Sequence, residues 1–124
     1  MMKHSLNEDS FSLEQGRRIQ DMYQITYVVC PLMETAEMIA KTLVTEHLAA
    51  CVNIFPVQSV YHWEGSLMQD QEVVILIKSK KDLEASILER VYSLHPYDTP
   101  CIVNIPITSG DPHYLAWLEA SLSN

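Results

Sequence analysis

Glycine and positive charge are both scarce in this chain, and each scarcity excludes a class of function. Only Gly16, Gly65 and Gly110 occur in 124 residues, so no glycine-rich loop is present to hold a phosphate. Eight lysine and arginine residues stand against sixteen aspartates and glutamates, which gives a net charge of −8. Such a surface repels nucleic acid and anionic membranes, so we expect neither as a partner.

Long apolar runs and paired cysteines are also missing. No run approaches the roughly 20 apolar residues of a membrane-spanning helix, and the first residues lack the apolar core of a signal peptide. The three cysteines cannot pair completely and lie in apolar surroundings, which is typical of a reducing compartment. We therefore expect a cytoplasmic protein.

The chain divides into two parts by composition. Residues 1–22 are polar, and their apolar residues are too sparse to form one face of a helix. This pattern predicts a flexible N-terminal extension. Residues 23–124 carry twelve acidic and five basic residues around regular apolar patterns. They predict a single globular domain.

The first half of the domain predicts a strand, a helix and a long hairpin. Residues 23–30 are rich in β-branched and aromatic side chains and end at Pro31. A strand over 50–64 is interrupted by Pro56, which implies a bulge or an edge position, and Gly65 allows a turn into a strand over 72–78. Between these strands, helical spacing predicts one buried stripe made of Ala36, Ile39, Ala40, Leu43, Val44 and His47.

The second half predicts a helix, a strand and a last helix. The helix runs over 80–94, with Ser79 as its N-cap and Asp82 closing a capping box. A strand follows over 102–107, and Asp111 caps the last helix. The order βαββαβ is the ferredoxin-like plan with an added C-terminal helix. Right-handed crossovers then give an antiparallel sheet of order 4-1-3-2.

This topology predicts a candidate metal site. Cys30 ends the first strand, while His95 and Cys101 precede the fourth, so all three should converge at one end of the sheet. Cys51 should lie at the other end. Two thiolates and an imidazole suit copper(I) or zinc. The alternative is that the cysteines are buried as small apolar side chains.

A second candidate site follows the hairpin and residues 95–100, which read His-Pro-Tyr-Asp-Thr-Pro. The two prolines make this loop stiff, so its side chains point in fixed directions. Tyr61 and Trp63 share one face of the hairpin and serve either a ligand or the packing of another subunit. Both roles, ligand contact and subunit packing, are possible if a cleft lies between subunits. Its edge would carry Glu64, Glu72, Lys78, Tyr97 and Asp98.

Catalysis has little support in the sequence. His95 beside a cysteine could form a thiolate–imidazolium pair, but nothing resembles an oxyanion hole. We therefore expect a binding or sensing protein that is not an enzyme.

Five segments together resemble the CutA divalent-cation-tolerance family over residues 23–124. They are Ala-Ala-Cys-Val-Asn at 49–53, Ser-Val-Tyr-His-Trp-Glu-Gly at 59–65, Glu72 with Lys78, the 95–100 loop, and Tyr-Leu-Ala-Trp at 114–117. The resemblance implies a ferredoxin-like homotrimer related in shape to the PII signalling proteins. It also implies metal tolerance and the binding of copper and other divalent ions, with no defined reaction. We expect that no metal is needed for folding.

One residue departs from the family pattern. The family usually has a glutamate after the 95–100 motif, where this chain has Cys101. A soft sulfur in place of a hard oxygen favours copper(I) or zinc over magnesium or calcium. The alternative function is a PII-like sensor whose intersubunit cleft takes a small anionic ligand near Lys78.

Overall fold

The structure is a computed structural model that describes residues 22–123. The N-terminal extension predicted over 1–22 therefore lies outside the described residues, apart from Met22. The elements are β1 (Tyr23–Cys30), α2 (Met33–Thr45), β2 (Cys51–Trp63), β3 (Ser66–Lys80), a short 3₁₀ turn η3 (Lys81–Leu83), α3 (Glu84–Leu94), β4 (Ile102–Pro106) and α4 (Pro112–Leu122).

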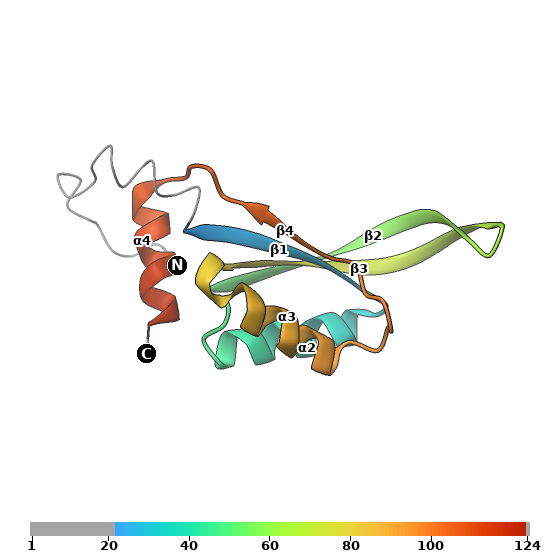
Figure 1. Cartoon of the computed structure of the whole chain (residues 1–124), viewed down its shortest axis with the longest axis horizontal. Coiled ribbons are helices and arrows are strands. Elements are labelled where there is room, and N and C mark those ends of the chain that lie inside the picture. The colour runs from blue at the N-terminus through green and yellow to red at the C-terminus, as the bar shows by residue number, and fades with distance from the viewer. Residues whose placement is uncertain (1–21, 124) are drawn as a thin grey trace.

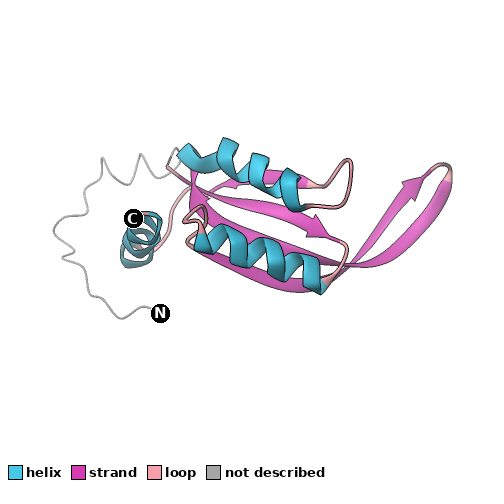
Figure 2. Ribbon diagram, turned by 90° about the horizontal axis from the view of Figure 1, so that it is seen from below, coloured by secondary structure: helices cyan, strands magenta, loops and turns pink. Residues whose placement is uncertain are grey.

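The four strands form one antiparallel sheet of order β2-β3-β1-β4. Helices α2 and α3 lie side by side on one face of it, and α4 stands at the end where β1 begins (Figures 1 and 2). This arrangement confirms the predicted ferredoxin-like fold and strand order. None of the described helices is long and apolar enough to cross a membrane.

The main core lies between the sheet and the two helices. Alternate side chains of β1 and β3 point toward α2 and α3, because successive residues of a strand face opposite sides. Burial of each large aliphatic side chain stabilises the fold by about 1.5–3 kcal/mol. The fully buried members of this core include Val28, Cys30, Ile39, Leu43, Ile75, Ile77 and Val91.

On the opposite face of the sheet, called here the open face, no helix among the described residues covers most of the length. It carries the other alternate residues, among them Tyr27 and Val29 of β1 and Phe55 of β2. Helix α4 covers only the end near Tyr23. Consequently Val103 and Ile105 of β4 remain 49% and 46% exposed. An apolar sheet face left this open in one chain is unusual for a soluble monomer.

The β2–β3 hairpin projects far beyond the rest of the sheet (Figure 1). Its pairing is unbroken from Cys51 opposite Lys78 to Trp63 opposite Ser66, whereas β1 pairs with β3 only as far as Val73. Residues 57–72, called here the arm, therefore form two strands without a third. Because the pairing passes Pro56 without an extra residue, this proline marks an edge strand and not a bulge.

The predicted cap at Ser79 is wrong. Strand β3 continues to Lys80 because β1 still pairs there, so Ser79 is a strand residue. Its hydroxyl donates a hydrogen bond to the carbonyl of Leu48 at 2.7 Å. Helix α3 begins only at Glu84, after the 3₁₀ turn, and no side chain caps it. The predicted cap at Asp111 is confirmed by its carboxylate, which accepts from the Tyr114 amide at 2.9 Å.

The buried stripe of α2 is shorter than predicted. Ala36, Ile39, Ala40 and Leu43 are buried, but Val44 and His47 are exposed. The helix ends at Thr45, and His47 adopts a left-handed conformation with φ of 59° that turns the chain back toward β2. Helical periodicity therefore no longer applies to His47.

The turn at the end of the arm gives the first test. Glu64 and Gly65 both have positive φ, 50° and 81°, as a two-residue type I′ turn requires. A Cβ on Gly65 would touch nothing within 4 Å, so Gly65→Ala costs only backbone strain, about 1–2 kcal/mol. Urea unfolding at fixed protein concentration should show this loss. Gly110→Ala is the control, since Gly110 has no positive φ; equal losses would contradict the turn assignment.

Candidate functional site

The three predicted metal ligands do lie at the same end of the sheet. The Val29 amide donates to the Cys101 carbonyl at 3.2 Å, and His95 contacts the Val29 carbonyl. Cys51 pairs with Lys78, which lies opposite Ile25 near the other end of β1. The strand order thus separates Cys51 from the other two cysteines, as predicted.

The two thiols at this end nevertheless lie on opposite faces. Cys30 is fully buried in the helix-covered core. Val28 pairs with Ile102, so the next pair outward is Val29 with Cys101, and that pair points to the open face. Cys101 is exposed there. Within residues 22–123, no three His, Cys, Asp or Glu side chains are placed to hold a metal ion.

The ring of His95 is fixed in one tautomer by two hydrogen bonds. Its Nε2–H donates to the Val29 carbonyl at 2.7 Å, because a carbonyl can only accept. Its Nδ1 accepts from the Tyr97 amide at 3.1 Å. Both ring nitrogens of this mostly buried residue are therefore engaged, and a metal would have to displace one of these bonds.

The 95–100 loop is tied to the base of the arm through a phenol and a carboxylate. The Tyr97 hydroxyl donates to the Glu72 carboxylate at 3.1 Å, and the Tyr97 ring lies 5.0 Å from the His95 ring. Partial burial first, and then Glu72, raise the pKa of Tyr97 to about 12. Burial and the same carboxylate raise the pKa of Cys30 to about 11. The negative charge of Glu72 therefore affects the pKa of a group on each face of the sheet.

A second phenol–carboxylate pair lies next to the first. The Tyr61 hydroxyl donates to Asp70, and this bond raises the pKa of Tyr61. Asp70 and Glu72 are two residues apart on β3 and share the open face. None of the ion pairs among the described residues involves either carboxylate. The base of the arm is thus a negative region with aromatic rings beside it.

The other predicted cleft residues lie elsewhere. Trp63 and Glu64 are exposed at the far end of the arm, and Asp98 is exposed in the loop. Lys78 lies toward the α4 end, where its ammonium is 5.5 Å from the centre of the Tyr114 ring. The predicted residues therefore lie in four places, and only Tyr61, Glu72 and Tyr97 form a cluster.

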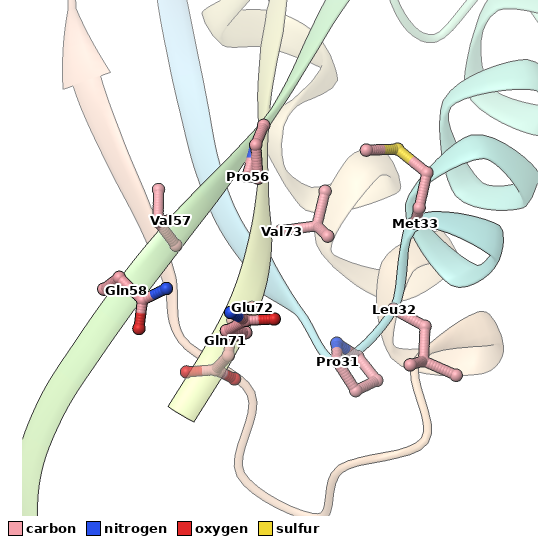
Figure 3. Close-up of a pocket in the computed structure, with 9 residues that line it drawn as sticks. All are labelled: Pro31, Leu32, Met33, Pro56, Val57, Gln58, Gln71, Glu72 and Val73. Carbon is pink, nitrogen blue, oxygen red and sulfur yellow. The ribbon is translucent and has the colours of Figure 1, made fainter. Parts of the chain in front are cut away.

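A pocket of about 530 Å³ opens between the start of α2 and the base of the arm (Figure 3). Pro31, Leu32 and Met33 form one side, and Gln58 with its cross-strand partner Gln71 forms part of the other. Sequence reasoning missed this pocket, and it missed Asp70. The two-residue spacing of Asp70 and Glu72 is a signal that could have indicated the acidic pair. The pocket joins segments far apart in the chain and had no local signal.

The raised pKa of Cys30 predicts a loss of stability at alkaline pH. The folded thiol holds its proton above its ordinary pKa of 9.0, so unfolding is favoured as pH rises past 9. The free energy of unfolding contributed by Cys30 should stay constant below that pH and fall toward pH 11. Cys30→Ala should remove this part of a urea-unfolding pH series, while Cys51→Ala should keep it. A curve unchanged by Cys30→Ala would contradict the burial argument.

Comparison with known proteins identifies the family. The profile of the family described as "CutA1 divalent ion tolerance protein" matches residues 24–121. The divalent-cation tolerance protein CutA of Thermus thermophilus is 45% identical over 99 residues, covering 79% of this chain and 96% of that one. The chloroplastic CutA of Arabidopsis thaliana is 42% identical over 101 residues, covering 81% and 56%.

Solved structures agree with this assignment. The periplasmic divalent cation tolerance protein CutA of Archaeoglobus fulgidus superposes with a TM-score of 0.80 at 38% identity, covering 82% of this chain and all of that one. CutA1 of Oryza sativa gives 0.79 at 38% identity, covering 83% and 95%. Sequence and fold together show that the chain belongs to the CutA1 divalent ion tolerance family.

Proposed function

We propose that the chain forms a homotrimer that contributes to divalent-cation tolerance by binding copper-type ions. The binding site lies at the Cys30 end of its sheet. The protein acts in the cytoplasm and is not an enzyme. The observation that carries the proposal is the family membership together with a thiol and an imidazole at one end of β1. The three unpaired cysteines support the cytoplasmic location.

The open face supports the assembly. It carries apolar side chains on all four strands, and α4 covers only one end of it. Three such faces meeting on a common axis would bury residues that are half-exposed in one chain, such as Ile105. Each Å² of apolar area removed from water stabilises the assembly by roughly 25 cal/mol.

The ionic surroundings support a cation as ligand. Glu72 and Asp70 lie near the 95–100 loop without an ion-pair partner among the described residues. The described donors do not form a ready-made site, so a metal ion must displace a proton from Cys30 and a hydrogen bond from His95. Such binding is a competition, and its affinity falls as pH drops.

The alternative ligand, a small anion near Lys78, has weaker support. Lys78 lies on the open face six residues from Glu72, about 20 Å along β3 at 3.3 Å per residue. The carboxylates at the base of the arm would repel an anion placed between these two points. We therefore expect ATP, used as the probe anion in calorimetry, to show no heat of binding.

Assembly can be tested on the open face. Light scattering should give three times the chain mass of 14.2 kDa. Ile105→Lys should shift the protein toward one chain mass, because an unpaired charge buried at an interface costs several kcal/mol. Leu88→Lys is the matched control, since Leu88 is 40% exposed on α3, on the other side of the sheet. A trimer unaffected by Ile105→Lys would place the interface elsewhere.

Metal binding can be tested by copper(I) competition with the reduced protein. Cys30→Ser and His95→Ala should each weaken copper(I) binding by more than about tenfold. Mutation of a residue that only hydrogen-bonds to a metal ligand already lowers metal affinity by that much. Cys51→Ser is the matched control and should keep full affinity. Cys101→Ser should weaken binding less than Cys30→Ser does, since the Cys101 thiol lies on the other face of the sheet. Equal losses in all three cysteine variants would refute the proposed site.

A further inference from the structure

His95 carries one ring nitrogen in the state that a metal ion requires, because a metal binds the lone pair of an unprotonated imidazole nitrogen. Nε2 bears the proton and donates it to the Val29 carbonyl at 2.7 Å, which leaves the lone pair on Nδ1. Histidine ligands of metals characteristically donate their other ring N–H to a carbonyl or carboxylate, and this bond fixes the orientation of the ring. The Val29 carbonyl is placed to do this when Nδ1 is the ligating nitrogen.

The lone pair of Nδ1 is covered by the loop that follows His95. The Tyr97 amide donates to Nδ1 at 3.1 Å, and the centres of the two rings lie 5.0 Å apart. Residues 95–101 lie between the end of α3 and the start of β4, in neither a helix nor a strand. Local opening costs the least free energy in segments of this kind. The contact between the amide and Nδ1 therefore depends on whatever else holds Tyr97.

The hairpin supplies this second hold on Tyr97. The Tyr97 hydroxyl donates to the carboxylate of Glu72 at 3.1 Å. Glu72 lies within the β2–β3 pairing, so the sheet fixes the position of its backbone. Pro96 and Pro100 each fix their own φ and stiffen the loop around Tyr97. When the phenol of Tyr97 is held, the amide of the same residue is therefore held over Nδ1 of His95.

We propose that the bond between Tyr97 and Glu72, called here the latch, controls access to the metal-binding nitrogen of His95. With the latch closed, the Tyr97 amide covers Nδ1. With the latch open, the loop releases Nδ1 as a donor, while the Val29 carbonyl still holds the ring. The inference rests on the proposed copper(I) site and concerns its regulation. It also gives a reason why the donors of residues 22–123 form no ready-made site.

Tyr61 provides a matched control for Tyr97. Its hydroxyl donates to Asp70, so it forms a second phenol–carboxylate bond at the base of the arm. Tyr61 belongs to β2, however, and the ring nitrogens of His95 bond to Val29 and Tyr97. Replacement of either tyrosine by phenylalanine removes one such bond and keeps both carboxylates. Only the Tyr97 replacement should open the latch.

Amide hydrogen exchange tests the latch in the reduced, metal-free protein. Tyr97→Phe removes the hydroxyl and keeps the amide of residue 97. Exchange of that amide should become about fivefold faster, the equivalent of a hydrogen bond worth about 1 kcal/mol. Tyr61→Phe should leave it unchanged. An exchange rate at residue 97 that Tyr97→Phe does not alter would show that Glu72 does not hold the loop.

Copper(I) competition tests the link between the latch and metal binding. Tyr97→Phe should bind copper(I) about fivefold more tightly than the unsubstituted protein, because the apparent affinity is proportional to the fraction of chains in the open form. A purely structural role of Tyr97 predicts equal or weaker binding. An equal gain in Tyr61→Phe would overturn the latch as the cause. Circular dichroism and light scattering establish that both variants keep the fold and the assembly.

The ligating nitrogen can be identified in the unsubstituted protein by NMR with ¹⁵N-labelled histidine. The His95 signals, assigned by their loss in His95→Ala, should show the proton on Nε2 before copper(I) is added. Addition of copper(I) should shift the Nδ1 signal and leave Nε2 protonated. A metal-induced loss of the Nε2 proton would overturn both the role of Val29 and the latch.

The outcomes separate this inference from the proposed function. Copper(I) binding that is lost in Cys30→Ser and His95→Ala, but is not tightened in Tyr97→Phe, overturns the latch and leaves the proposed site intact. Absence of copper(I) binding in both the unsubstituted protein and Tyr97→Phe overturns the proposed site and the latch with it. Tighter binding and faster exchange in Tyr97→Phe, by the same factor, support the latch.

Discussion

The pairing of β1 with β3 is the constraint on which the rest of the structure depends. Its register sets Cys30 opposite Val73, which places both in the helix-covered core and sends Glu72 to the open face. A slip of one residue would exchange the two faces along the whole strand. The same register also ends the third strand at Val73, so the arm begins there. The core, the acidic region and the arm therefore all depend on the register between β1 and β3.

Glu72 connects the two faces electrostatically. It accepts the Tyr97 hydroxyl on the open face and contributes to the raised pKa of Cys30 in the core. Asp70 adds a second negative charge beside it. Its hydrogen bond raises the pKa of Tyr61, while partial burial and then Glu72 raise the pKa of Tyr97. Because the ion pairs of the described residues lie elsewhere, this region attracts cations. A region that attracts cations agrees better with membership of a divalent-cation tolerance family than with a role as a sensor of anions.

The sequence was sufficient for the strand order, because apolar alternation and right-handed crossovers leave few arrangements. It also placed Cys30, His95 and Cys101 at one end of the sheet. It could not place their side chains, since Cys101 precedes β4 by one residue and its face depends on a register that no motif encodes. Ser79 was misassigned for a similar reason, because β1 extends β3 through a residue that otherwise resembles a helix cap. The pocket arises from segments distant in the chain.

The hydrogen bonds of His95 link the proposed metal site to the base of the arm. Its Nδ1 holds the Tyr97 amide, and Tyr97 in turn holds Glu72 at the base of the arm. A metal ion that takes Nδ1 must break the first of these bonds and so release the loop from its fixed position. The arm would then lose one of its polar connections to the domain. At the proposed site, a metal ion on His95 would therefore be coupled to the position of the arm through Tyr97 and Glu72.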